Sequence, residues 1–311
     1  MIHILMAVYN GKRYLGRQLE SIGKQTVTDW KLHIRDDGST DGTLDIIEEF
    51  AKRYPGKVLL LEEPQKKNYG AKGNFAKLVE SVREEGDYAF CDQDDIWEPD
   101  KLQISFTELR KIEKDKDGVI KPAMVCSDAR IIDENGVVTG ESFAAKSSLY
   151  VPGRHLFERL LLYNFAQGAT MMWNMPLHGM IRHIPAEAVM HDWWVALVAA
   201  GRGRIYYIPK QLLSYRQHGN NELGEFDRKT WHRSFMNKIR ISNWRELIRN
   251  NRELQNERIR QAEVFDRMYG GRLARRYADI MKKGRITRTI SGITEGYIFL
   301  SVTYSVKYYI L

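Results

Sequence analysis

The chain has few of the residues that covalent or metal frameworks need. Its 311 residues include only 2 cysteines, Cys91 and Cys126, which excludes a disulfide framework and a cysteine-rich metal site. Both lie in apolar runs that predict buried strands, and this favours a reducing cytoplasm. With 8 prolines, 43% hydrophobic and 11% aromatic residues, the composition also excludes a collagen-like chain and wholesale disorder.

Long apolar runs are missing from residues 1–224, where none reaches the roughly 18 residues that a membrane-spanning helix needs. The apolar start from Ile2 to Val8 has no basic flank before it and meets polar Asn10 and Gly11 at once, so we expect no secretory signal. A Gly-x-Gly-x-x-Gly turn is also missing after this first apolar run. Its absence argues against a nicotinamide or flavin dinucleotide site.

Most of the chain also lacks a charge excess. The net charge is +8, but residues 225–311 hold 19 Lys/Arg against 9 Asp/Glu, whereas residues 1–224 hold 29 against 31. The sequence therefore predicts a near-neutral body over 1–224 and a basic, mainly helical segment over 225–311. A length in this range suits one large α/β domain with a smaller appendage.

In the first half, short apolar runs alternate with amphipathic segments, a pattern typical of a largely parallel sheet flanked by helices. We expect four early strands, at residues 3–8, 31–35, 58–61 and 88–91, with the third one buried like the others. Asn135-Gly136 lies between two apolar pairs and predicts a hairpin.

Acidic residues follow two of these strands. Asp92-Gln93-Asp94-Asp95 comes directly after Cys91, and alternate residues of an extended chain point the same way, so Asp92 and Asp94 can converge on a Mg²⁺ or Mn²⁺ ion. The alternative is a solvated loop that caps the next helix. Asp36-Asp37-Gly38-Ser39 ends the second strand, at the sheet edge where ligands bind in such folds, or it is an ordinary turn and N-cap.

Three more segments carry polar residues that can complete a site. The glycine-bearing loop Asn68 to Phe75 can approach a nucleotide closely, or it is a plain connection. Asp192 stands among His191, Trp193 and Trp194, where desolvation would raise its pKa toward that of a useful base; the alternative is an N-cap. His218 can complete a carboxylate-held metal site, although a lone histidine is more often structural.

Over residues 1 to about 221, the order of these motifs resembles that of the family-2 glycosyltransferases of the GT-A fold. The matching motifs are Val8-Tyr9-Asn10, residues 36–41, residues 92–95 and His191-Asp192. Residues 92–97, 167–170, 191–194 and 215–221 look like those of bacterial rhamnosyltransferases of cell-wall or surface polysaccharide synthesis. The resemblance implies a Rossmann-like α/β domain over 1–224 and a C-terminal helical extension.

The resemblance also implies a role for each matching residue. Donor binding falls to Val8, Tyr9, Asn10, Asp36, Asp37, Asn68, Asn74, Asp92, Gln93 and Asp95. Asp92, Asp94 and His218 would hold Mg²⁺ or Mn²⁺, and Asp192 would be the catalytic base. Acceptor binding falls to Gly168, His191, Trp193 and Trp194; at position 191 the family more often has Glu or Asp.

The implied reaction is an inverting transfer of one sugar, L-rhamnose from dTDP-rhamnose, to a saccharide linked to a polyprenyl diphosphate. A UDP-hexose donor is an alternative. The Gln-x-x-Arg-Trp motif and the membrane spans of processive synthases are missing, which predicts transfer of a single residue. A sugar-nucleotide pyrophosphorylase is a further alternative, but it would need a Gly-rich loop with a basic residue near Ala7 to Gly11.

The basic segment interleaves arginines with aromatic residues, namely Trp231, Phe235, Trp244 and Phe265. Either its helices pack these rings on the body, or they bind an anionic membrane and hold the protein at the inner face of the cell membrane. The apolar run 296–306 has 11 residues, too few to span a bilayer. A nucleic-acid-binding module is a further alternative for this segment, because arginines with interleaved aromatic residues also suit phosphate and base contacts. No nucleic-acid motif accompanies the charge, so we expect no nucleic-acid partner. The oligomeric state stays open, with a homo-oligomer among the alternatives.

Overall fold

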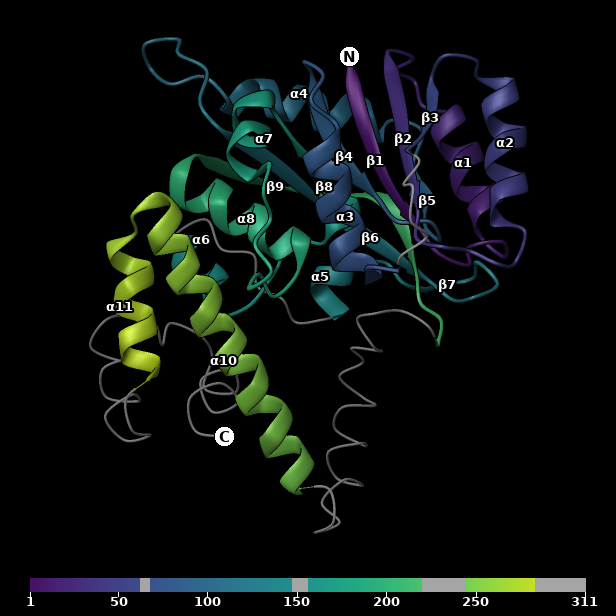
Figure 1. Cartoon of the computed structure of the whole chain (residues 1–311). Coiled ribbons are helices and arrows are strands. Elements are labelled where there is room, and N and C mark those ends of the chain that lie inside the picture. Colours follow the sequence, from purple (N-terminus) through teal and green to yellow (C-terminus); the bar gives the residue numbers. More distant parts are fainter. Residues whose placement is uncertain (62–67, 147–155, 220–243, 283–311) are drawn as a thin grey trace.

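The computed structural model describes residues 1–61, 68–146, 156–219 and 244–282. In these ranges the chain forms a nine-stranded sheet in the order β3-β2-β1-β4-β8-β6-β9-β5, with β7 beside β6 (Figure 1). The strands are β1 (Ile2–Val8), β2 (Trp30–Asp36), β3 (Val58–Leu60), β4 (Asp87–Cys91), β5 (Ile96–Trp97), β6 (Ala123–Ile132), β7 (Val138–Gly140), β8 (Met171–Trp173) and β9 (Arg204–Arg216). The pairs β1/β2, β1/β4, β2/β3 and β6/β9 are parallel, which confirms a mostly parallel α/β sheet.

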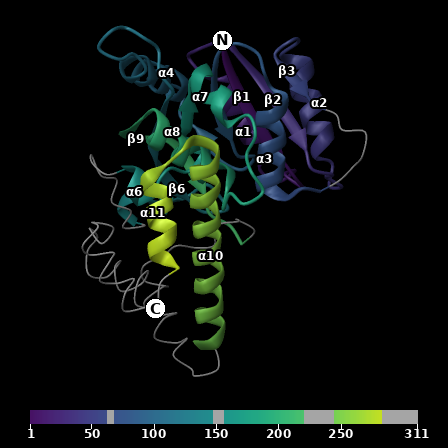
Figure 2. The same cartoon turned by 60° about the vertical axis from the view of Figure 1, so that its left-hand side comes forward.

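Helices cover both faces of the sheet and make a three-layer body, on which α10 and α11 form an antiparallel pair (Figures 1 and 2). One face carries α1, α2 and α4, and the other carries α3, α6, α7 and α8. The helical segments are α1 (Leu15–Gly23), α2 (Thr43–Arg53), α3 (Gly70–Ser81), α4 (Lys101–Ile112), α5 (Phe143–Lys146), α6 (Leu156–Leu160), the 3₁₀ turn η1 (Gly168–Thr170), α7 (Met175–Ile181), α8 (His191–Arg202), α10 (Trp244–Tyr269) and α11 (Arg272–Met281).

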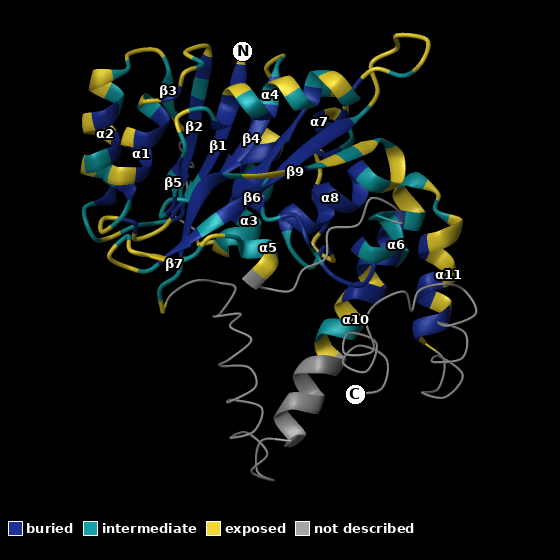
Figure 3. Ribbon diagram, turned by 180° about the vertical axis from the view of Figure 1, so that it is seen from behind, coloured by how far each residue is buried: buried dark blue, intermediate teal, exposed yellow. Residues whose placement is uncertain are grey.

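The central strands are buried on both faces because successive side chains point to opposite sides of the sheet. On β1, Leu5 packs under α3 and α8, whereas Ile4 and Met6 pack under α1 and α2. The strands are accordingly buried along most of their length (Figure 3). This double burial explains why these strands read as continuous apolar runs in the sequence.

Parallel pairing brings the ends of β1, β2 and β4 to one edge of the sheet. Val8 lies opposite Asp36 on β2, and Met6 lies opposite Cys91 on β4. The segments that leave these strands, which begin at Tyr9, Asp37 and Asp92, are therefore neighbours in space. They contain most of the polar residues singled out above.

The structure confirms the early strands and the hairpin, but one expectation was wrong. β3 is not buried: it is the edge strand, its side chains are partly accessible, and Leu60 is 38% exposed. The hairpin forms between β6 and β7, where Ile132 pairs with Val138 and Gly136 takes φ of 92° in the turn. That left-handed conformation suits a residue without a Cβ.

The C-terminal helices are attached to the body by buried contacts. Phe265 of α10 is 1% exposed and lies against Trp194 of α8, with ring centroids 6.2 Å apart. The Arg258 guanidinium donates to the Leu162 carbonyl at 2.7 Å, and the Val189 N–H donates to the Gln261 side chain at 2.9 Å. For the described part of α10 and α11, these contacts support the first of the two alternatives given above, in which the helices of the basic segment pack on the body.

Several features expected of the basic segment lie outside the described residues, among them Trp231, Phe235 and the apolar run 296–306. The side chain of Trp244 is not described either. None of the helices in the described ranges combines the length and the apolar character that crossing a bilayer requires.

We expect Phe265→Ala to lower the free energy of unfolding by about 3 kcal/mol or more, because it opens a cavity between α8 and α10. Met268→Ala on the same helix is the matched control. Its side chain is 42% exposed, so its change should stay within about 0.5 kcal/mol. Urea unfolding of both variants measures the difference, and equal stabilities would show that α10 is not held by this contact.

Candidate active site

Gln93 fixes the first loop at the carboxyl edge of the sheet. Its side-chain amide accepts a hydrogen bond from the Tyr9 N–H at 2.9 Å and donates one to the Tyr9 carbonyl at 3.0 Å. Gly11 leaves room for this contact, since a Cβ there would lie 2.4 Å from Gln93 Oε1. The backbone of Tyr9 is thereby held, although the residue as a whole stays 48% exposed.

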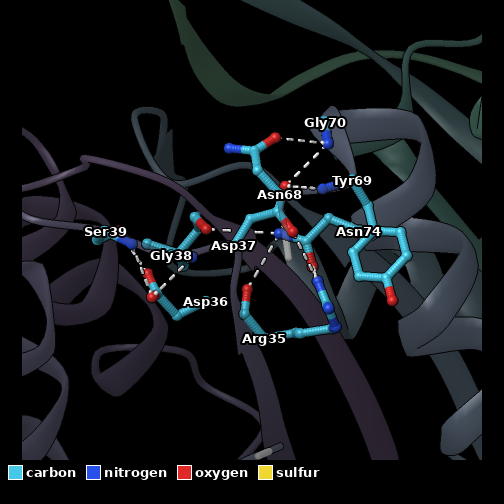
Figure 4. Close-up of polar contacts among 10 residues, drawn as sticks. Arg35, Asp36, Asp37, Gly38, Ser39, Asn68, Tyr69, Gly70 and Asn74 are labelled. Atoms are coloured by element: carbon cyan, nitrogen blue, oxygen red, sulfur yellow. Dashed lines mark hydrogen bonds and ion pairs between the residues drawn. The ribbon is translucent and has the colours of Figure 1, made fainter. Parts of the chain in front are cut away.

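The loop after β1 is also tied to the loop after β2. The Asn10 N–H donates to Ser39 Oγ at 2.8 Å, and Asn10 Oδ1 accepts from the Thr40 N–H at 2.9 Å. Asn10 takes φ of 47°, a left-handed conformation that asparagine tolerates better than most residues. Asp36 accepts from the backbone N–H groups of Gly38 and Ser39, which shapes the turn (Figure 4).

A buried ion pair lies behind these loops (Figure 4). Arg35 is 3% exposed; its guanidinium lies 2.9 Å from Asp37 Oδ1 and donates to Asn74 Oδ1 at 2.9 Å. The second oxygen of Asp37 accepts from the N–H groups of Tyr69 and Gly70, both at 2.8 Å. Asn74 in turn donates to the Arg35 carbonyl at 3.2 Å.

This network uses about three of the four lone pairs of the Asp37 carboxylate inside the protein. Asp37 therefore joins the end of β2 to the start of α3, and its contact with a nucleotide base stays a prediction. Asn68 is exposed at the start of the same segment, and its side chain accepts from the Gly70 N–H at 3.0 Å.

The acidic segment after β4 meets the end of β9. His218 Nε2 lies 2.8 Å from Asp94 Oδ2, and the His218 ring stacks on Tyr14 with centroids 5.0 Å apart. Arg216, fully buried, donates from Nε to the Asp94 carbonyl at 2.8 Å and from its backbone N–H to Asp95 Oδ1 at 3.0 Å. The structure thus brings Asp94 and His218 together from segments 124 residues apart.

Asp95 is the buried member of this group. Its burial, followed by the charges of Asp94 and Asp92, raises its pKa well above 3.8. Its Oδ2 atom has no hydrogen-bond partner among the described residues. This shift favours the protonated form of Asp95, and its expected contact with the donor sugar stays a prediction.

Asp94 and His218 offer two ligand atoms that fit a Mg²⁺ or Mn²⁺ ion. Among the described residues, the ligand atoms of Asp92, Asp94 and His218 do not all lie within 4.8 Å of one another, so Asp92 as a third ligand stays a prediction. Two ligands at right angles on an ion with bonds of about 2.1 Å lie about 3 Å apart, close to the Asp94–His218 separation of 2.8 Å. Asp92 stands two residues before Asp94, and its charge also acts on Asp95. Carboxylate oxygens with one imidazole suit these hard cations.

Asp192 lies in the first turn of α8, beside η1. The Gly168 N–H donates to its Oδ2 at 3.1 Å, and the Trp193 N–H donates to its Oδ1 at 2.6 Å. Burial raises the pKa of Asp192 to about 6 against the opposing effect of these hydrogen bonds. The expectation that desolvation raises this pKa is confirmed.

The other residues assigned to the acceptor are buried, as Asp192 is. His191 stacks on Phe75 at 4.1 Å, and burial lowers its pKa to about 3, so its ring is neutral. Trp193 donates from its indole to the Leu160 carbonyl at 2.5 Å, and Trp194 is fully buried under α10. Acceptor contacts of His191, Trp193, Trp194 and Gly168 stay predictions.

Sequence reasoning gave no role to three residues that shape the site: Arg35, Arg216 and Tyr14. Arg35 left a signal, since a charged residue inside an apolar strand and two residues before an aspartate predicts a buried pair. Arg216 lies in the motif 215–221 but was not singled out. Tyr14 carried no signal, because its contact with His218 joins segments far apart in the sequence.

Three comparisons place this arrangement among known proteins. The family model described as "Glycosyl transferase family 2" matches residues 3–176. The dTDP-rhamnosyl transferase RfbG of Shigella flexneri is 30% identical over 236 residues, which cover 70% of this chain and 73% of the relative.

Two solved structures share the fold. The crystal structure of S. aureus TarS 1-349 superposes with a TM-score of 0.54 at 16% identity and covers 96% of this chain and 93% of that one. The mannosyltransferase PcManGT from Pyrobaculum calidifontis, in complex with GDP-Man and Mn²⁺, superposes with a TM-score of 0.51 at 13% identity and covers 98% and 77%. Both likenesses support the GT-A fold of the chain.

We expect Gln93→Leu to weaken the binding of UDP or dTDP about fivefold or more, because it leaves the N–H and carbonyl of Tyr9 without their partner. The control is Gln103→Leu on α4, whose side chain is exposed. Titration calorimetry with Mn²⁺ present measures both. Unchanged affinity in the Gln93 variant would mean that the loop after β1 does not depend on this clamp.

Proposed function

The chain belongs to glycosyl transferase family 2, and from that premise we propose an inverting, metal-dependent transfer of one L-rhamnose residue from dTDP-rhamnose to a saccharide acceptor. The observation that carries the choice of sugar is the 30% identity to a dTDP-rhamnosyl transferase over 70% of the chain. We propose a polyprenyl-diphosphate-linked acceptor in cell-wall or surface polysaccharide synthesis.

The donor nucleotide would lie at the carboxyl edge of the sheet. The exposed ring of Tyr9 and the exposed Asn68 border this edge, and the buried Arg35–Asp37 pair holds the backbone beneath them. The diphosphate would reach the segment after β4, where Asp92 and Asp94 lie. A Mg²⁺ or Mn²⁺ ion on Asp92, Asp94 and His218 would supply Lewis-acid stabilisation of the leaving diphosphate.

The chain's own groups prepare this place for a cation. The stacked Tyr14 ring and Asp94 hold the His218 imidazole from two sides, so its orientation is fixed before any ligand arrives. Arg216 holds the backbone of Asp94 through the carbonyl and so positions its side chain. Protonation of Asp95, which its raised pKa favours, would remove its own repulsion with Asp92 and Asp94.

Asp192 would accept the proton of the acceptor hydroxyl. In a single displacement the acceptor oxygen bonds to the anomeric carbon, the bond from that carbon to the diphosphate oxygen breaks, and the hydroxyl proton moves to the Asp192 carboxylate. A pKa of about 6 keeps Asp192 mostly ionised at pH 7 and makes it a stronger base than an exposed aspartate. Attack opposite the leaving group inverts the anomeric centre.

Residues 1–224 would carry this chemistry, and residues 225–311 would hold the protein on the inner face of an anionic membrane. The net charge of +10 in the second part supports this location, because basic residues near anionic lipid contribute about 1 kcal/mol each. A lipid-linked acceptor would be presented at the same surface.

We expect Asp192→Asn to lower turnover about 100-fold or more while donor binding is kept. In the parent, kcat/KM should fall about tenfold per unit below pH 6, because protonation of Asp192 removes the base. The variant should lose this limb of the pH profile. Asp279→Asn, an exposed position on α11, is the control, and a parent-like rate in Asp192→Asn would remove Asp192 from this role.

A donor screen tests the choice of sugar nucleotide. With Mn²⁺ present, dTDP-rhamnose should raise the melting temperature more than UDP-glucose, UDP-galactose or UDP-N-acetylglucosamine, and EDTA should abolish both stabilisation and transfer. Stronger stabilisation by a UDP-sugar would replace the rhamnosyl assignment with a UDP-hexose one. Full transfer in EDTA would instead contradict the role of Asp92 and Asp94.

A further inference from the structure

A second set of metal-ligating side chains lies at the opposite edge of the sheet, where the chain begins (N in Figure 1). His3 of β1, His33 of β2 and Glu84, just before β4, each place one ligand atom within 4.8 Å of the others. We propose that these three residues bind a transition-metal dication of the Zn²⁺ type, separate from the ion of the transfer reaction.

The two imidazoles already face each other. His3 Nδ1 lies 3.0 Å from His33 Nε2, and two nitrogens bound to one zinc at about 2.0–2.1 Å each are separated by about 3 Å. Both rings are buried, so their direction is fixed by packing; the Tyr88 ring lies 5.2 Å from that of His3. Only a small movement separates this pair from a chelating one.

The other nitrogen of His3 has the partner that metal-binding histidines usually have. His3 Nε2 lies 3.1 Å from the Glu85 carbonyl, which can only accept, so this nitrogen carries the proton. The lone pair of Nδ1 therefore accepts a hydrogen bond from His33 Nε2, and metal binding would require His33 to move that proton to its other ring nitrogen. A ring N–H donated to a backbone carbonyl is the usual way in which a ligating imidazole is oriented.

Gly86 lets the segment with Glu84 approach His3. A Cβ at Gly86 would lie 2.6 Å from the Met1 carbonyl and 2.9 Å from the His3 ring, and its φ of 154° also favours glycine. The segment 84–86 can therefore lie directly on the first residues of β1. This approach brings a carboxylate within reach of two buried imidazoles.

The charges at this edge are mixed: the Glu84 carboxylate favours a cation, whereas the Lys31 ammonium and the N-terminal ammonium oppose one at His3. Burial lowers the pKa of His3 and lowers that of His33 to about 4, so both rings are neutral ligands at pH 7. The hydrogen bond from Lys31 lowers the pKa of Glu84, which is therefore ionised. Two neutral imidazoles and one carboxylate make a His₂Glu set, which is known to bind zinc with a fourth position open.

Lys31 is the group that competes with the metal. Its ammonium lies 2.6 Å from Glu84 Oε2, and 30% of its side chain is exposed, so it can turn into water when a dication takes the carboxylate. If Glu84 is a zinc ligand, Lys31 competes with zinc for it. If the histidine pair has only a structural role, the charge of Lys31 should not affect zinc affinity. Removing the positive charge at position 31 should tighten metal binding.

This site is distinct from the donor edge in place and in chemistry. Five residues of extended strand separate His3 from Val8, about 17 Å along β1. Imidazole-rich sites prefer zinc, cobalt and nickel, whereas Asp92 and Asp94 suit Mg²⁺ or Mn²⁺. A bound ion here would link β1, β2 and the segment before β4, and would stabilise the folded chain by mass action.

The test uses the full chain, stripped with EDTA and then kept in excess Mg²⁺, and the variants identify which bound zinc belongs to this site. In calorimetric titration with Zn²⁺, the parent should bind one equivalent more than His33→Gln does. At a zinc concentration of 100 times the Kd, the melting temperature of the parent should rise by about 4 °C. Co²⁺ in place of Zn²⁺ should give the visible absorption bands of a site with nitrogen ligands, and these should also be lost.

Two surface variants decide the outcome even if His33→Gln fails to fold. Glu84→Gln should weaken Zn²⁺ binding about tenfold or more, and Lys31→Met should tighten it several-fold, while sugar transfer with Mg²⁺ stays at the parental rate in both. Equal zinc affinity in the parent and both variants would overturn the proposal. So would weaker binding in Lys31→Met, because the ammonium would then be supporting the site.

Discussion

The buried ion pair between Arg35 and Asp37 is the constraint on which the carboxyl edge of the sheet depends, where β1, β2 and β4 end and where we propose that the donor binds. Neither charge reaches water, and removing one partner of such a pair typically costs about 3–5 kcal/mol because the other charge stays buried. The pair also spans elements: Asp37 holds the first N–H groups of α3, and Asn74 returns from α3 to the backbone of β2. The loops that would meet a nucleotide are therefore held from beneath by a structure that cannot relax locally.

Burial also tunes the carboxylates at this edge in two ways. Asp95 and Asp192 both have raised pKa values, but Asp95 has other carboxylates as neighbours whereas Asp192 is surrounded by backbone N–H groups and aromatic rings. Asp95 is shifted toward its protonated form, which would leave two carboxylates, those of Asp92 and Asp94, as the charged ligands of a cation. Asp192 has a pKa of about 6, close enough to physiological pH for it both to accept and to release a proton. One physical cause thus serves two chemical tasks.

The strands and acidic loops could be predicted because they depend on local pattern: apolar runs mark β1, β2 and β4, and Asp92 follows Cys91 directly. The partial exposure of β3 could not be predicted, because the edge position of this strand follows from the strand order of the sheet and not from the residues Val58 to Leu60. The stacking of Tyr14 on His218 and the clamp of Gln93 on Tyr9 join distant segments, which no local pattern encodes. The raised pKa of Asp192 was predictable because its bulky neighbours adjoin it in the sequence.

The hydrogen bond from the Val189 N–H to Gln261 gives the C-terminal helices a part in placing Asp192. It lies three residues before that carboxylate, on the segment that leads into α8. The change in charge near residue 224 is therefore not a structural boundary, since α10, which lies beyond it, holds the backbone three residues before Asp192. A displacement of α10, for example on binding to a membrane surface, would therefore be transmitted through Gln261 to the start of α8, where Asp192 lies.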